Sequence, residues 1–95
     1  MTDIAFTWIG HSTFLFEFDN KKVLLDPFIN GNPVSTMKAD DVSADLIVVS
    51  HGHGDHIADA ISVANRTGAK VLCNFEISGW FGRNGMRDGL AVGMN

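Results

Sequence analysis

The chain of 95 residues has few of the residues that stabilise secreted proteins or anchor membrane proteins. Its one cysteine, Cys73, excludes an internal disulfide, and its place in the apolar run 69–73 predicts a buried strand thiol. No uninterrupted apolar run approaches the roughly 18 residues of a membrane-spanning helix. No basic stretch precedes an apolar one near the N-terminus, so no secretory signal is expected. A reducing cytoplasm is therefore the expected compartment.

Basic residues are also scarce. Seven lysines and arginines stand against eleven aspartates and glutamates, which gives a formal charge of -4 and no footprint for nonspecific nucleic-acid binding. Hydrophobic residues make up 45% of the chain and charged residues 19%, a balance typical of a globular protein. The length allows one domain at most.

Alternating apolar residues predict strands in the first part of the chain. Two strands are expected within residues 3–18, with a bend at 10–12, and a third strand is expected from Lys22 to Asp26. Short antiparallel pairing is the simplest topology for the three. A polar loop follows to Asp45, with a helical turn predicted around Thr36 to Asp40.

The next stretch predicts a βαβ unit: a buried strand at 46–50, a helix at about 57–67 and a strand at 70–74. A second helix is expected from the N-cap Asn74 to the pair at 84–85, and another strand from Leu90. The first helix is expected to bury Ile57, Ala60, Ile61 and Ala64, and to turn Asp59, Ser62, Asn65 and Arg66 to solvent.

The loop His51–His56 carries three of the chain's four histidines together with Asp55. Imidazole is a common transition-metal ligand, and a carboxylate completes a typical hydrolytic metal site. Spacing of two in an extended loop points His51 and His53 to the same side, which suits two corners of a tetrahedral site. The loop therefore predicts a metal site, against the alternative of loop histidines that bind no metal.

Two serines near this loop are weak candidates for a nucleophile. Ser12 and Ser50 have no evident base as partner apart from the loop histidines, which disfavours a serine mechanism.

The pattern His-x-His-x-Asp-His at 51–56 resembles the signature of the metallo-β-lactamase superfamily. The flanking sequence is similar to one branch, the metal-dependent hydrolases related to L-ascorbate-6-phosphate lactonase, and the similarity runs from Ile4 to Asn95. The resemblance implies an α/β fold, namely the αββα sandwich that is built from two similar halves. Residues 1–95 would form the N-terminal half, a single partial domain with helices on one face of a mixed sheet. The segments that carry it are Trp8–Phe14, Leu24–Phe28, Phe28–Pro33 and Gly93–Asn95.

The resemblance also implies a site for two divalent metals, zinc above all, with manganese as an alternative. It assigns Asp55 and His56 to the second metal, beside a first metal on His51 and His53. Asp55 would in addition orient the attacking water and accept its proton, although a helix cap is an alternative and compatible role. Further ligands would come from the later half, since no histidine follows His56.

Two residues before the loop are candidates for supporting roles. Asp26 resembles a family position that buttresses the metal loop through hydrogen bonds, and its alternative is an ordinary turn aspartate before Pro27. His11 is predicted to line the site and hold substrate or a ligand, or else to bond nearby backbone in the turn.

The remaining aromatic and basic residues are expected to be structural. Trp8, Trp80 and Phe81 are predicted to lie in the core. Arg83 and Arg87 are candidates to meet an anionic substrate, but solvated surface charge is the favoured interpretation.

Two functions follow from these observations. The first is a hydrolase that uses metal-activated water on an ester, lactone or phosphoester of a small molecule, with no nucleic-acid or membrane partner. The second is a non-catalytic metal-binding or assembly half-domain that needs a C-terminal half or a second chain. An open sheet edge expected after Val92 would allow pairing, including homo-oligomers.

Overall fold

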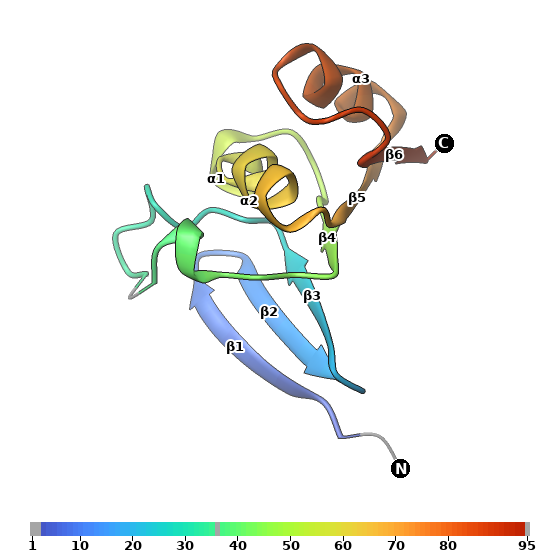
Figure 1. Cartoon of the computed structure of the whole chain (residues 1–95). Helices are drawn as coiled ribbons and strands as arrows, with labels where there is room; N and C mark the ends of the chain where they lie inside the picture. Colours follow the sequence, from blue (N-terminus) through green and yellow to red (C-terminus); the bar gives the residue numbers. More distant parts are fainter. Residues whose placement is uncertain (1–2, 36, 95) are drawn as a thin grey trace.

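The computed structural model describes residues 3–35 and 37–94, and these form a six-stranded mixed sheet with its strands in chain order (Figure 1). The first three strands pair antiparallel and the last four pair parallel. This confirms the predicted hairpin strands and the βαβ unit. The strands are β1 (Ala5–Gly10), β2 (Thr13–Phe18), β3 (Lys21–Leu25), β4 (Leu46–Val48), β5 (Lys70–Asn74) and β6 (Ala91–Met94).

The helices are short and follow the parallel strands. They are the 3-10 helix η1 (Ala39–Asp41), α1 (Gly54–Ile57), α2 (Ala60–Thr67) and α3 (Phe75–Arg83). Helix α3 begins as predicted, because the Asn74 side chain accepts a hydrogen bond of 2.8 Å from the backbone N–H of Ile77. The helical turn predicted around 36–40 corresponds to η1, which begins later, at Ala39. The first residue of the predicted turn, Thr36, lies outside the described residues, as does Asn95 of the family-like C-terminal segment.

The prediction of one helix over 57–67 with Asp59 facing solvent is wrong. The helical segment begins earlier, at Gly54, and is interrupted at Ala58 and Asp59. Asp59 is only 7% exposed, and its carboxylate accepts hydrogen bonds of 2.6 and 3.0 Å from the backbone N–H groups of Ile29 and Asn30. Burial of the carboxylate is favourable here because it accepts hydrogen bonds from two backbone N–H groups that would otherwise lack a partner.

The helices pack on one face of the sheet, as expected (Figure 1). The core lies between these helices and the sheet. Leu24, Ile47 and Val71 point from neighbouring strands into this core and are fully buried. Gly93 lets α3 lie close to β6, because a Cβ there would stand 2.9 Å from the Cα of Phe75. Packing, and not helix length, therefore holds these short helices in place.

Cys73 lies in this core, as predicted from its apolar surroundings. It is a buried free thiol in β5, and burial raises the pKa of the thiol because the thiolate is poorly solvated there. A buried thiol of raised pKa is a poor nucleophile and a poor metal ligand.

The opposite face of the sheet is apolar but half-buried or exposed. The register places apolar side chains from every strand on this face, together with Lys21, Lys70 and Asn74 at strand ends. We call this set the open face: Phe6, Trp8, Phe14, Phe16, Val23, Leu25, Leu46, Val48, Leu72, Val92 and Met94.

The prediction that Trp8 and Trp80 are core residues is wrong, whereas Phe81 is fully buried as predicted. Trp8 is 57% exposed because it belongs to the open face, and Trp80, in α3, is 42% exposed. Among the described residues, no helix has the length and apolar character needed to cross a membrane.

Candidate metal centre

Three chain segments meet at the edge of the sheet where β3 and β4 end. Because these strands are parallel, the backbone N–H of Asp26 reaches the carbonyl of Val48 at 2.8 Å, just before the histidine loop. The β1–β2 turn arrives at the same edge, since the hydroxyl of Thr13 donates a 2.6 Å hydrogen bond to the carbonyl oxygen of Asp26. Sheet topology thus brings His11, Asp26 and the loop at 51–56 together.

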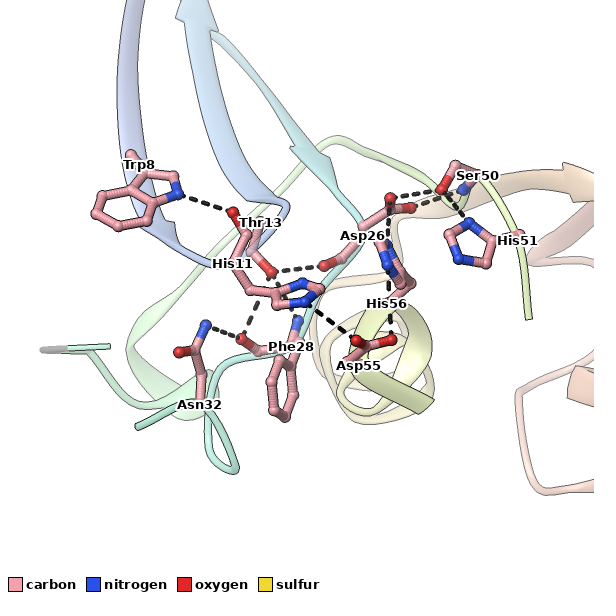
Figure 2. A network of polar contacts seen from close by, with 10 residues as sticks. All are labelled: Trp8, His11, Thr13, Asp26, Phe28, Asn32, Ser50, His51, Asp55 and His56. Carbon is pink, nitrogen blue, oxygen red and sulfur yellow. Dashed lines mark hydrogen bonds and ion pairs between the residues drawn. The ribbon is translucent and has the colours of Figure 1, made fainter. Parts of the chain in front are cut away.

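Asp26 lies at the centre of the polar network in Figure 2. Its side chain is buried, with a residue exposure of 2%, and its backbone has a φ of 47°, a conformation that side chains other than glycine rarely adopt. One carboxylate oxygen, Oδ1, accepts a 2.6 Å bond from the backbone N–H of Ser50. The other, Oδ2, accepts 2.6 Å from the Ser50 hydroxyl and contacts His56 Nδ1 at 2.8 Å.

This network determines which ring nitrogens of two histidines stay available. A carboxylate only accepts, so the Nδ1–H of His56 donates to Asp26 and its Nε2 keeps a lone pair. The Ser50 hydroxyl donates to Asp26, so its oxygen accepts from His51 Nδ1, 2.9 Å away. The Nε2 of His51 therefore also keeps a lone pair that a metal could use. One buried carboxylate orients two imidazoles in the manner of residues that support metal ligands.

A second group of potential metal ligands consists of His11, Asp55 and the Nε2 atom of His56. His11 Nε2 lies 3.1 Å from Asp55 Oδ2, and His56 Nε2 lies 3.5 Å from Asp55 Oδ1. His11 reaches Asp55 from a bend with φ 54°, and that bend is fixed by the Trp8 indole N–H, which donates to the His11 carbonyl at 2.9 Å. Strained backbone of this kind often occurs at functional sites.

His53 is the most exposed of the loop histidines. Its ring packs edge-on against His51 at a centroid distance of 4.6 Å. His53 is the N-cap of α1, and Asp55 lies in the first turn of that helix. The alternative of Asp55 as the helix cap is therefore wrong.

The donor set suits a divalent metal. The rings of His51 and His56 are 3.9 Å apart and those of His11 and His56 are 5.2 Å apart, each measured between centroids. In the described part of the chain, ligand atoms lie within 4.8 Å of one another in two groups. These are His11, Asp55 and His56, and Asp26, His51 and His56. Imidazole nitrogen and carboxylate oxygen are the ligands of hydrolytic zinc and manganese sites.

The grouping differs from the pairs expected from the sequence, because His53 belongs to neither group and His56 belongs to both. The rings of His51 and His53 contact each other, and His56 lies near Asp55, so the assignment of each pair to one metal stays a prediction. Sequence reasoning treated Ser50 only as a possible nucleophile and missed its contact with Asp26. The available signal was its position directly before His51.

A model of the beta-lactamase superfamily domain matches residues 5–83. Among curated relatives, a metal-dependent hydrolase of Heliobacterium modesticaldum is 51% identical over 88 residues, and one of Thermoplasma volcanium is 49% identical over 84 residues. These alignments cover 92% and 88% of this chain but 37% of each relative.

Solved structures agree with this assignment. Igni18, a metallo hydrolase from the archaeon Ignicoccus hospitalis, is 35% identical with a TM-score of 0.83, over 100% of this chain and 40% of that one. A second structure, from Parabacteroides distasonis, is 23% identical with a TM-score of 0.70 over 85% of this chain and 36% of that one, a likeness of fold. The chain thus spans about two-fifths of the length of the proteins it matches. The shared fold, the histidine loop and these similarities together show that the chain belongs to the beta-lactamase superfamily.

Proposed function

We propose that this chain supplies the metal-binding part of a metal-dependent hydrolase that acts on an ester, lactone or phosphoester of a small molecule. The observation that carries the proposal is the buried Asp26 carboxylate, which holds His56 directly and His51 through Ser50 at one edge of the sheet. Orienting two imidazoles in this way has a cost in buried charge and backbone strain that a ligand site would justify.

In this proposal His51 and His53 hold one divalent cation, and Asp55 and His56 hold another. Zinc is the metal best matched to histidine-rich sites, with manganese as the alternative. A bound cation would polarise the scissile bond and lower the pKa of water. Asp55 orients the attacking water and accepts its proton, while His11 holds the Oδ2 oxygen of Asp55 in place.

The formal charge of -4 favours a small-molecule substrate over a nucleic acid. The names of the two curated relatives and of Igni18 support hydrolysis in general. The choice among ester, lactone and phosphoester rests on the resemblance to the lactonase branch.

The test uses the protein that carries this chain, with a panel of nitrophenyl esters, a lactone and a phosphodiester. We expect chelation to abolish hydrolysis and Zn²⁺ or Mn²⁺ to restore it. Asp55→Asn should lower kcat by roughly 10²–10⁴-fold, because the water loses its base. Asp40→Asn, at an exposed carboxylate in η1, is the matched control and should leave kcat unchanged. Hydrolysis that survives both chelation and Asp55→Asn would exclude the proposed mechanism.

A second candidate is an assembly module without turnover of its own, which another chain completes. The open face favours it, because contiguous apolar surface of this extent usually marks an interaction site. Strand β6 also forms one edge of the sheet, where further strand pairing is possible. In this case the occupant of the open face is a second sheet, contributed by the remainder of a longer protein or by a second copy.

A further inference from the structure

A pocket of about 330 Å³ opens between the histidine loop and α3. Its volume lies within the range of small-molecule sites. The pocket shares a wall with the metal centre, since Gly52 stands between His51 and His53, and a Cβ at Gly52 would lie 3.6 Å from Ile77 Cδ1. The lining residues are Gly52, Ile57, Glu76, Ile77, Trp80 and Arg83.

Apolar side chains line part of this pocket. Trp80 offers an indole that is partly exposed, and the buried ring of Phe81 supports it at a centroid distance of 5.7 Å. Ile57 and Ile77 are half-buried beside it. An aromatic or aliphatic ring bound here would be removed from water against these three side chains, which is the main source of affinity in such sites.

The pocket also contains two opposite charges that are not paired with each other. Arg83 and Glu76 lie seven residues apart on α3 and form no salt bridge in the described part of the chain. Gly79 leaves room for the arginine, because a Cβ there would stand 3.1 Å from Arg83 Nη1. Arg87, the other arginine considered from the sequence, is not among the residues that line the pocket.

We infer that this pocket binds the part of the substrate that lies beyond the scissile bond, a ring-shaped or planar apolar group that carries a carboxylate or phosphate. The ring lies against Trp80 and the anion pairs with Arg83, which presents a planar set of donors suited to both anions. Glu76 accepts from hydroxyl groups at the other end and repels a second anion. Calling the occupant a substrate rests on the proposed hydrolase function, whereas the binding site itself does not.

The experiment measures binding of phenylphosphonate, which is not hydrolysed, against benzyl alcohol as the neutral probe. Indole fluorescence of Trp80 reports binding in a Trp8→Phe background, which removes the other tryptophan of these 95 residues. We expect saturable binding of phenylphosphonate that weakens by about tenfold in Arg83→Gln, because a charge-assisted contact is lost. Arg83→Lys should restore part of the affinity, and Glu76→Gln should increase it because a like charge is removed.

Arg87→Gln is the matched control and should leave binding unchanged. Circular dichroism confirms that each variant is folded. The same titration is repeated with a chelator present, and the pocket should then still bind phenylphosphonate in an Arg83-dependent way. Equal binding by the parent and Arg83→Gln, or binding that requires metal and ignores Arg83, would overturn the inference while leaving the hydrolase proposal intact. Arg83-dependent binding by a protein without hydrolytic activity would refute the hydrolase proposal alone.

Discussion

At the scale of single residues, Asp26 has the largest influence on the candidate site. Its Oδ2 contacts both the Ser50 hydroxyl and His56 Nδ1, so the orientation of His51 and His56 depends on one side chain. The carboxylate is buried, and the protein replaces its lost hydration with three directed hydrogen-bond partners. A small change in this residue should therefore act on the metal ligands and not only on packing.

We predict that Asp26→Asn lowers zinc affinity by roughly 10–100-fold, because one of the two accepting oxygens becomes an NH2 group, which leaves either the Ser50 N–H or both the Ser50 hydroxyl and His56 without an acceptor. Ser50→Ala should have a smaller effect, since Asp26 still holds His56 and His51 is the only candidate ligand that loses its partner. Competition with a chromophoric chelator measures the affinity. Asp88→Asn, at an exposed carboxylate, is the control. Unchanged affinity in a folded Asp26→Asn variant would show that the network does not support metal binding.

At the scale of secondary-structure elements, the join between α1 and α2 is the feature that positions the site. Helix α1 is a single turn, too short to be stable alone, yet it carries Asp55 and His56. Asp59 ends this turn and ties it to the loop after β3, because its backbone N–H donates to the Pro27 carbonyl at 2.9 Å. The same loop presents Phe28, whose ring packs edge-on against His11.

Asp59→Ala should destabilise the protein by about 1–3 kcal/mol, because the backbone N–H groups of Ile29 and Asn30 lose their buried acceptor. Urea denaturation measures the free energy of unfolding. The exposed position Asp88 again provides a comparison, and Asp88→Ala should change the stability by less than about 0.5 kcal/mol. Equal stability of the two variants would mean that the Asp59 contacts contribute nothing net.

At the scale of the whole molecule, the sheet has two unlike faces. Helices cover one face, and the open face carries aromatic side chains that contact one another, with ring centroids of Phe14 and Phe16 5.9 Å apart. Phe6, at the edge of this face, is 67% exposed. A second sheet packed on this surface would remove its apolar side chains from water, as in sandwich folds.

Association of the chain through this face should weaken at least roughly tenfold in Phe6→Lys, because an interface aromatic is replaced by a hydrated charge. Val34→Lys changes an exposed apolar residue in the loop after β3, outside the open face, and should leave association unchanged. Sedimentation analysis measures the oligomer, and native mass spectrometry counts chains and metals together. A stable monomer that holds two tightly bound metals would contradict the assembly candidate.

Much of this organisation could be predicted from local sequence. The strands, the βαβ unit and the start of α3 at Asn74 follow from side-chain periodicity and capping, which act over a few residues. The burial of Asp59 could not be predicted, because its helical position points outward by periodicity while its partners, Ile29 and Asn30, lie about 30 positions earlier. The exposure of Trp8 could not be predicted for a similar reason, since alternation predicts that a strand has two faces but not which face is covered.

The sequence by itself determined the chemistry of the site. The histidine loop after a buried strand contains nitrogen and oxygen donors of the kinds that bind divalent metals, and its residue types and spacing are local properties. Only the tertiary structure decided that Asp26 and His11 join this loop, and that Arg83 lines a pocket whereas Arg87 does not. The reason is physical: strand pairing and helix packing bring together residues far apart in the chain, and no local pattern records which distant groups will meet.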